Sequence, residues 1–326
     1  MYFLGADAGG TKTAFVLSDE NGRILARHNA GPCTFISYGS EHLAKIMREG
    51  LDAICAKTEI SPQNITYAAL GIPGCGEKEN SVTEITAVCE SAGLTNKITC
   101  ANDSYIGWAG SLALQPGVNI IAGTGSICYG VNAAGETARS SGWGHCCDEG
   151  SCRWLGERLI ALYAKQADGR LPRTPLYEIF RKHFNINEDL HFIHQLNHGL
   201  GGKEIAALQV LLLEAYNQGD EHAKILYNEA AAELVLASST VARKLNLITT
   251  NSSSASRETA PKATVSYSGG LFKAGDCILV PLSEKLAEAG CRLVAPKFPP
   301  ELGAVLIAMQ QILPKIPFED FTDETL

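Results

Sequence analysis

The sequence predicts an α/β protein of two similar domains, and three observations support this. Short apolar segments alternate with segments of helical period, which is typical of parallel strands joined by helices. A glycine-rich hairpin at residues 2–23 has a counterpart at residues 118–136. A chain of 326 residues can bury two cores. We place the boundary near residue 114, with domains at residues 1–114 and 115–326.

The first half begins with a hairpin. Residues 2–6, 13–17 and 24–26 are expected to be strands, with a turn at residues 19–22. A helix is expected after Ser40, where apolar residues recur at helical spacing through Cys55.

The rest of this half alternates strand and helix. Residues 65–72 are mostly apolar and predict a strand. Ser81 and Glu84 match a capping box, so a helix is expected to begin there. Residues 98–101 predict a short strand that runs into Asn102 and Asp103.

The second half opens with the repeated hairpin. Nine positions separate Thr13 from Gly22, and nine separate Ser126 from Gly135. Three further elements are expected, namely a helical region at 152–247, a surface loop at 249–262 and a strand within 263–272. A proline-started apolar helix is expected at 299–313, followed by a loose acidic end.

Composition narrows the class of protein. The formal net charge of -8 argues against nucleic acid or an anionic membrane as the main partner. No apolar run approaches the ~20 residues of a membrane span, and residue 2 already begins a strand pattern rather than a signal peptide. A cytoplasmic protein with reduced thiols is expected, because most of the eleven cysteines occupy apolar positions. These are Cys55, Cys89, Cys100, Cys128, Cys277 and Cys291.

The two glycine loops are candidate phosphate sites. In a strand-turn-strand loop, glycines let backbone N–H groups point into one concavity. In the first loop, Gly9 and Gly10 precede Thr11, Lys12 and Thr13, which add hydroxyl donors and a charge. Asp7 can hold a hydrated Mg²⁺, which prefers one or two carboxylates plus water. A single such loop is more often structural, but the second loop, at residues 123–126, favours binding of a triphosphate by the pair.

Asp103 is the candidate general base. It follows a strand at the carboxyl edge of the predicted sheet, where ligands of open α/β sheets gather. A carboxylate there can take a proton from a hydroxyl group. The alternative, an aspartate that only caps the next helix, is the commoner role for this residue type.

The segment 141–156, SGWGHCCDEGSCRWLG, is unlike a core segment. Trp143 can pack on a sugar face, while Asp148 or Glu149 accepts hydrogen bonds from sugar hydroxyls. A zinc site formed by His145, Cys146, Cys147 and Cys152 is the alternative. It is disfavoured because adjacent cysteines fit one tetrahedral ion poorly and no CxxC pair is present.

The order of these motifs resembles that of N-acetylglucosamine kinases and, more broadly, of the BadF/BadG/BcrA/BcrD ATPase family. The motifs are Asp7-Ala-Gly-Gly-Thr-Lys-Thr13, Asp103, Gly123-Thr-Gly-Ser126, Gly142-Trp-Gly144, Asp148-Glu-Gly-Ser151 and Ser268-Gly-Gly270. The resemblance covers nearly the whole chain. It implies two RNase H-like domains of the actin and hexokinase type around an ATP cleft, the second with a helical insertion. Helix 300–313 would return to the hinge, near Gly71 and Gly303.

The resemblance also implies an activity and its residues. ATP with Mg²⁺ would phosphorylate the 6-hydroxyl of an N-acetylated amino sugar, N-acetylglucosamine or N-acetylmuramate, with Asp103 as the base. The nucleotide contacts would be Gly9, Gly10, Thr11, Lys12, Thr13, Gly123, Thr124, Gly125, Ser126, Gly269 and Gly270. The sugar contacts would be Thr34, Asn102, Asp103, Gly142, Trp143 and Asp148, in a homodimer.

Two departures from the family pattern fall among the sugar contacts. Relatives usually carry a glycine before the DEGS segment, but here only three residues separate Gly144 from Asp148, one fewer than usual. Relatives often have asparagine at the position of Thr34. ATP use is therefore the firmer inference, and the identity of the sugar the weaker one.

Three other functions stay open. Glucosamine or glucose would suit the same kinase fold. An ATPase that activates an electron-transfer partner through an iron–sulfur cluster between two subunits would explain Cys146, Cys147 and Cys152. A sugar-sensing repressor is disfavoured by the acidic charge and by the lack of room for a helix-turn-helix before the first strand.

Overall fold

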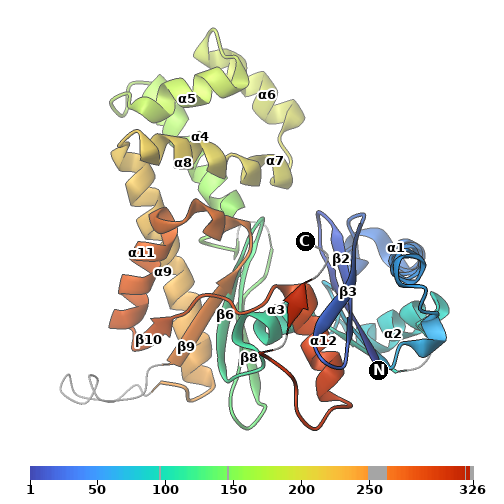
Figure 1. Cartoon of the computed structure of the whole chain (residues 1–326). Coiled ribbons are helices and arrows are strands. Elements are labelled where there is room, and N and C mark those ends of the chain that lie inside the picture. Colours follow the sequence, from blue (N-terminus) through green and yellow to red (C-terminus); the bar gives the residue numbers. More distant parts are fainter. Residues whose placement is uncertain (95–96, 145–146, 249–262, 320, 324–326) are drawn as a thin grey trace. The chain divides into compact units, whose positions relative to one another are not determined.

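The chain folds into two compact units (Figure 1). The computed structural model describes residues 1–94, 97–144, 147–248, 263–319 and 321–323. The first unit comprises Met1–Pro116 and Ala295–Leu326, and the second comprises Gly117–Val294.

The first unit is built on a six-stranded sheet in the order β11-β3-β2-β1-β4-β5. Strand β2 is antiparallel to both of its neighbours, β1 and β3. The other pairs, β1 with β4, β4 with β5 and β3 with β11, are parallel. The strands are β1 (Tyr2–Ala8), β2 (Thr13–Asp19), β3 (Arg23–Ala30), β4 (Tyr67–Gly71), β5 (Ile98–Ala101) and β11 (Thr322–Asp323).

Four α-helices of the first unit are described. They are α1 (Phe35–Thr58), α2 (Ser81–Ser91), α3 (Asp103–Leu112) and α12 (Pro300–Gln310), with a short 3₁₀ helix, η1 (Pro62–Asn64). Helix α1 begins five residues before Ser40, and a kink at Gly39 (φ 74°, ψ -175°) separates its first turn from the rest.

The expected capping box at the start of α2 is wrong. Asn80, with φ 64°, is the N-cap residue, so Ser81 already lies inside the helix. The Ser81 hydroxyl instead donates to the Lys78 carbonyl (2.7 Å) and accepts from the Gly76 amide (3.0 Å). The turn before the helix therefore uses this hydroxyl, and Glu84 lacks a hydroxyl partner at the cap.

Helix α12 belongs to the first unit, although residues 115–326 were expected to form the second domain. All residues from Leu302 to Met309 are buried, because the helix packs on β1, β4 and α3. A side chain at Gly5 would collide with the Glu301 carbonyl, and one at Gly303 with the Ile106 carbonyl. Two glycines thus let α12 lie against β1, from the opposite end of the chain, and against α3.

The second unit repeats the first. Its five-stranded sheet has the order β10-β9-β6-β7-β8, which is the order of β5, β4, β1, β2 and β3. The strands are β6 (Gly117–Ala122), β7 (Ser126–Val131), β8 (Thr137–Ser141), β9 (Ala263–Ser268) and β10 (Cys291–Leu293). The internal repeat expected from the two hairpins is therefore a repeat of whole sheets.

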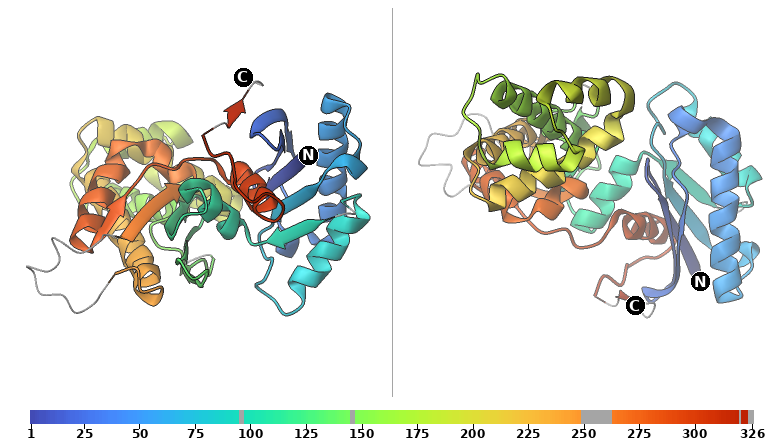
Figure 2. Two further views of the ribbon diagram at one scale, coloured as in Figure 1. Left: turned by 60° about the horizontal axis from the view of Figure 1, so that its bottom comes forward. Right: turned by 90° about the horizontal axis from the view of Figure 1, so that it is seen from above.

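A helical region is inserted between β8 and β9, as expected for residues 152–247 (Figure 2). It contains α4 (Cys152–Ala167), α5 (Pro175–Phe184), η3 (Asp189–His191), α6 (Phe192–Gly199), α7 (Gly202–Ala207), α8 (Gln209–Asn217) and α9 (Glu221–Lys244). After β9, the chain continues through η4 (Gly270–Ala274) and α11 (Asp276–Glu288). The loop expected at 249–262 lies outside the described residues.

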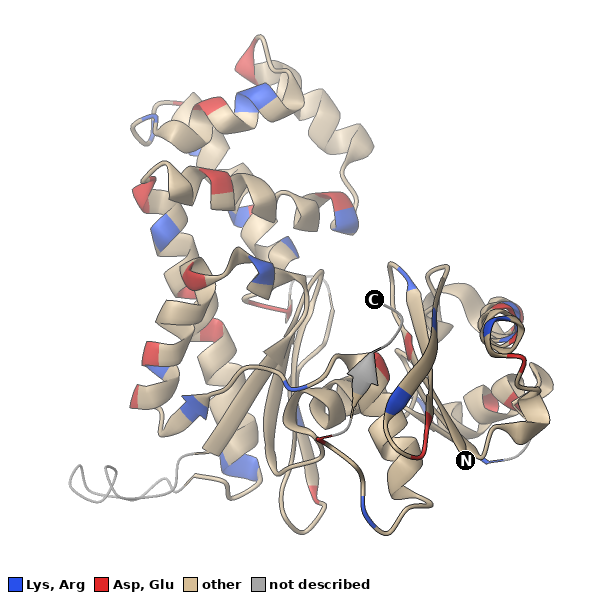
Figure 3. Ribbon diagram, in the orientation of Figure 1, with Lys and Arg blue, Asp and Glu red and all other residues tan. Residues whose placement is uncertain are grey.

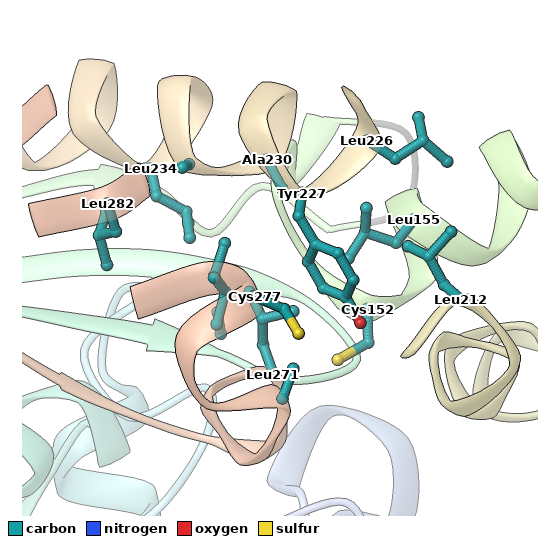
Figure 4. Close-up of a cluster of buried hydrophobic side chains, with 14 of the residues drawn as sticks. Cys152, Leu155, Leu212, Leu226, Tyr227, Ala230, Leu234, Leu271, Cys277 and Leu282 are labelled. Atoms are coloured by element: carbon teal, nitrogen blue, oxygen red, sulfur yellow. The ribbon is translucent and has the colours of Figure 1, made fainter. Parts of the chain in front are cut away.

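The core of the second unit uses cysteine as an apolar filler. Cys152 and Cys277 lie with Tyr227 and Leu271 in one buried cluster (Figure 4). Burial raises the pKa of the Cys152 thiol to about 11.

Residues of both charge signs occur on the helices of each unit (Figure 3). Among the described residues, no helix combines the length and apolar character needed to cross a membrane.

Candidate active site

The first glycine hairpin joins β1 to β2. Ala8 pairs with Thr13, and the Gly9 amide donates to the Lys12 carbonyl (3.0 Å). The Gly9 carbonyl accepts from the Cys33 amide (2.9 Å), which ties the loop to the chain after β3. A side chain at Gly10 would meet no atom within 4 Å. No packing contact therefore requires a glycine there, whereas the approach of a ligand to the backbone would.

The three polar side chains of this loop have different surroundings. Thr11 and Lys12 are exposed, and the Lys12 ammonium donates to Asn29 Oδ1 (3.3 Å). Thr13 is buried, and its hydroxyl donates to the Gly31 carbonyl (2.8 Å). A hydroxyl has one proton, so the Thr13 hydroxyl, bonded to Gly31, has no donor left for a ligand. The exposed Thr11 side chain remains accessible to one.

The second hairpin repeats this design in the second unit. Ala122 pairs with Ser126, and the Gly123 amide donates to the Gly125 carbonyl (2.9 Å). The Gly123 carbonyl accepts from the Cys152 amide (2.8 Å). Ser126 is buried and donates to the Glu149 carbonyl (2.7 Å), whereas Thr124 is exposed.

The double glycine after β9 lies beside the second hairpin. A side chain at Gly123 would come within 3.9 Å of the Gly270 amide nitrogen. Gly269 has φ 106°, and a side chain there would collide with the Ala122 backbone. The structure thus brings together two of the predicted nucleotide-binding segments.

Asp148 organises the segment that follows β8. One carboxylate oxygen accepts from the Trp143 amide (2.8 Å) and the Gly144 amide (3.0 Å). The other would be 2.6 Å from a side chain at Gly125, so the buried carboxylate lies directly over the second hairpin. Gly142, with φ 74°, donates from its amide to the Ser126 carbonyl (2.9 Å).

Trp143 is held at the surface of this segment. Its side chain is 80% exposed, which is unusual for the largest apolar side chain. Such a ring offers a flat face to a ligand. His145 and Cys146 of the alternative zinc site lie outside the described residues, and Cys152 is buried in the core while Cys147 is exposed. Within the described part of the chain, no three His, Cys, Asp or Glu side chains could jointly hold a metal ion.

Asp103 is not the cap of its helix. Asn102 is the N-cap of α3, and its side-chain Oδ1 accepts from the Ser104 amide (3.1 Å) and the Ser104 hydroxyl (2.6 Å). The Asn102 amide group donates to Glu77 (3.2 Å). Asn102 therefore fixes the start of the helix, and the Asp103 carboxylate is not needed for capping.

Asp103 lies next to Asp7. The two strands β1 and β4 pair Asp7 with Gly71, and a side chain at Gly71 would be 3.2 Å from the Asp103 Cα atom. Such a side chain would also collide with Ile106. Because Gly71 has no side chain, α3 approaches the sheet closely enough to bring the two carboxylates together.

Burial raises the pKa of Asp7 well above its ordinary value. The negative charges of Asp103 and Glu301 raise that pKa further, whereas Lys12 lowers it. A cation near Asp7 would relieve this repulsion. The donor chemistry fits a Mg²⁺ ion held through water and nucleotide phosphates, since Mg²⁺ keeps several waters and needs few carboxylates.

Glu301 was missed by the sequence predictions. It lies in the first turn of α12 and pairs with Arg27 of β3 (3.2 Å). An acidic residue in the first turn of a helix is commonplace, so the sequence contained no signal. Its relevance follows only from the packing of α12 against β1.

Thr34 precedes α1 in the first unit. Its hydroxyl oxygen is buried and has no hydrogen-bond partner among the residues that the structure describes. It is also the N-cap residue of α1, yet its side chain makes no capping bond. A buried hydroxyl without a partner is costly, so this atom is suited to a ligand.

Taken together, the paired sheets and their hairpins define a two-unit, actin-like ATPase fold of the sugar kinase type. The chain belongs to the BadF/BadG/BcrA/BcrD ATPase family, whose model matches residues 4–308. This confirms the family and the fold class expected from the motifs.

Two curated relatives and one solved structure are similar to the chain. The N-acetylmuramic acid/N-acetylglucosamine kinase of Clostridium acetobutylicum is 33% identical over 76% of this chain and 81% of its own. The N-acetyl-D-glucosamine kinase of Dictyostelium discoideum is 28% identical over 94% and 97% of the two chains. A Chromobacterium violaceum structure, provisionally called an N-acetylglucosamine kinase, has a TM-score of 0.74 at 25% identity. The match covers 94% of this chain and 98% of that chain.

Proposed function

We propose that the protein is an ATP-dependent kinase that phosphorylates the 6-hydroxyl of an N-acetylated amino sugar. Two curated relatives that match most of the chain are named as kinases of N-acetylated amino sugars. The observation that carries the proposal is the position of Asp103 beside Asp7, with its helix capped by another residue.

Asp103 acts as the general base. The sugar 6-oxygen attacks the γ-phosphorus of ATP, its proton passes to the Asp103 carboxylate, and the bond to the β-phosphate oxygen breaks to release ADP. Asn102, proposed from the motif as a sugar contact, supports this step by holding the first turn of α3.

The two hairpins contact the phosphates of ATP. In the first, the backbone at Gly10, the Thr11 hydroxyl and Lys12 provide donors and charge, while the Gly9 amide is bonded to the Lys12 carbonyl and shapes the loop. In the second, the backbone of Thr124 and Gly125 and the Thr124 hydroxyl do so, while the Gly123 amide is bonded to the Gly125 carbonyl. Gly269 and Gly270 lie against the adenosine. Thr13 and Ser126 contribute their backbone, since their hydroxyls are bonded to carbonyls. Asp7 would hold Mg²⁺ through water, and the ion would supply charge neutralisation for the phosphates.

In the second unit, the exposed ring of Trp143 is a sugar contact. In the first unit, the buried hydroxyl of Thr34 is another. Asp148 and the Gly142 backbone shape the same segment, and the second Asp148 carboxylate oxygen is available to a sugar hydroxyl. N-acetylglucosamine is the primary substrate. N-acetylmuramate is a second candidate because the relative with 33% identity is named for both sugars.

A coupled assay of ADP release with Mg²⁺-ATP tests the proposal. The panel contains N-acetylglucosamine, N-acetylmuramate, glucosamine and glucose, compared by kcat/KM. We expect the two acetylated sugars to react best. Reaction with glucosamine or glucose alone would refute the sugar assignment. If none of the four sugars on the panel supported ADP release, the kinase assignment would be refuted.

The cellular setting is also part of the proposal. We infer a cytoplasmic homodimer in amino sugar metabolism. The acidic chain and its buried thiols support the cytoplasmic setting. Light scattering over a range of concentrations would measure the mass. A monomer at all concentrations would contradict the dimer.

A further inference from the structure

The helical insertion of the second unit contains a cavity that none of the proposed ATP or sugar contacts line. It lies between α4, α5, η3 and α6, and its volume is about 640 Å³. Pockets of ≈ 300–1,000 Å³ are typical of small-molecule sites. Its lining combines aromatic, aliphatic and guanidinium groups, including Tyr163, Tyr177, Ile193, Arg173 and Arg181.

The cavity has a fixed polar floor. Asp189 accepts hydrogen bonds from the hydroxyls of Tyr163 (2.8 Å) and Tyr177 (2.8 Å). Tyr163 stacks on Phe180 with ring centroids 4.2 Å apart, and Phe192 meets both rings edge-on. Hydrogen bonds and ring stacking therefore hold these side chains in place before any ligand binds.

The rim of the cavity is apolar and open to solvent. Leu190 is 75% exposed, Ile193 55% and Leu196 39%, and all three line the cavity. Three large aliphatic side chains gathered at the mouth of a preformed cavity are a candidate contact surface for the body of an apolar ligand.

The charge inside the cavity is positive at one point. Arg181 donates to the carbonyls of Ile186 and Asn187 and lies 3.6 Å from Asp189, so it neutralises that carboxylate. Arg173 lies over the Tyr177 ring at 4.2 Å and 3.7 Å from Asp189, too far for a hydrogen bond.

Two further acids line the cavity without cancelling this charge. Asp168 is paired with Arg170 (2.6 Å). Glu188 is 78% exposed beside His191, where solvent screens its charge. The Arg173 guanidinium is therefore left to receive an acid group.

We propose that this cavity is a second ligand site, which binds a small amphipathic anion. An aromatic or aliphatic body packs on Ile193 and its neighbours, and an acid group pairs with Arg173. The site does not depend on the proposed kinase activity, and its test is separate from the sugar panel.

The probe for the test is 8-anilinonaphthalene-1-sulfonate, an aromatic anion whose fluorescence rises in apolar surroundings. We expect one saturable site per chain in the full-length protein. Ile193→Asp should weaken binding about tenfold or more, because it places a carboxylate in the apolar rim and repels the probe. Arg173→Ala should weaken binding about fivefold, as for a partly exposed charge pair.

Each variant has a matched control in the same unit. Ile225 is 50% exposed on α9 and outside the cavity lining, so Ile225→Asp should change the dissociation constant less than about twofold. Arg158 stacks on Trp154 at 4.0 Å and lies 3.7 Å from Glu229, much as Arg173 does with its own partners. Arg158→Ala should likewise leave binding unchanged.

An uncharged probe isolates the acid group. N-phenyl-1-naphthylamine lacks the sulfonate, so it should bind the wild type more weakly, and this difference should vanish in Arg173→Ala. Equal effects of the Arg173 and Arg158 variants would overturn the proposal, as would displacement of the sulfonate probe by ATP. The proposal would also be overturned if the probe stopped binding when the protein formed a dimer and if Ile193→Asp disrupted that dimer. A second copy of the chain would then occupy this surface.

Discussion

The two glycine hairpins share one backbone design but have different neighbours. In each, the first glycine accepts from a cysteine amide, an exposed threonine precedes a buried hydroxyl residue, and that hydroxyl donates to a carbonyl. Around the first hairpin stand Asp7, Asp103 and Glu301. Beside the second stand Asp148 and Gly270.

This difference teaches how a repeated fold divides its work. The backbone supplies amides at both loops, whereas the side chains packed around each loop decide its chemistry. Carboxylates near the first hairpin suit proton transfer and a hydrated cation. A carboxylate bonded to loop amides near the second suits shape and recognition of a ligand.

The largest effect is expected at Asp103, the proposed general base of the first unit. Asp103→Asn should lower kcat at least about a hundredfold, because the proton of the sugar hydroxyl loses its acceptor. ATP affinity and melting temperature should change little, since Asn102 caps α3. Asp276→Asn is the control, because Asp276 has the same first-turn position on α11 in the second unit. Near-normal turnover in Asp103→Asn would remove the base from the mechanism.

The second test compares the loop glycines of the two units. A side chain at Gly10 or Gly270 would meet no protein atom within 4 Å, so alanine there should leave the fold intact. Each variant should weaken ATP binding about tenfold by keeping phosphates or adenosine from the backbone. Gly199→Ala, which also adds a side chain in open space, is the control. Calorimetric ATP affinities equal to wild type would make that loop structural only.

The third test separates the two hydroxyls of each hairpin. Thr11→Ala and Thr124→Ala should weaken ATP binding about threefold at unchanged stability, since one hydrogen bond to ligand is lost. Thr13→Ala and Ser126→Ala should instead cost about 1 kcal/mol of unfolding free energy, because each removes a partly buried hydrogen bond to a carbonyl. Denaturant unfolding and ATP titration on all four variants would check this. The reverse pattern in either unit would show that the two hairpins are not equivalent.

The smallest effect concerns the charge at Asp7. Its pKa in the folded protein is raised, so ionising it opposes folding at neutral pH. Asp7→Asn should therefore raise the melting temperature at pH 7 by about 3 °C in EDTA, although activity is lost. Below about pH 4 the unfolded chain also takes up the proton, so the gain should shrink.

An exposed carboxylate serves as the control for this test. Asp52 lies on the solvent side of α1. Asp52→Asn should give no comparable gain at neutral pH. A neutral-pH gain for Asp7→Asn that persists undiminished at pH 4 would mean that ionisation of the Asp7 carboxyl, opposed by burial and by the neighbouring charges, is not its cause.

The strands and hairpins that the two units share could be predicted from the amino-acid sequence. Alternating apolar segments and glycine loops are local signals, so strands, the helical insertion and both hairpins could be read from residue order alone. The family motifs, in turn, named Asp103 and the loop residues. Local signals were less reliable at boundaries, as Ser81 shows, because a turn can use the hydroxyl that a helix cap would need.

Contacts between residues far apart in the chain could be found only from the tertiary structure. The packing of α12 in the first unit brings Glu301 toward Asp7, from opposite ends of the chain. The absence of a side chain at Gly71 admits α3 and its Asp103. The buried, unpartnered hydroxyl of Thr34 and the cavity beside Arg173 are likewise properties of packing. Burial and close approach depend on every element at once, and no short segment encodes them.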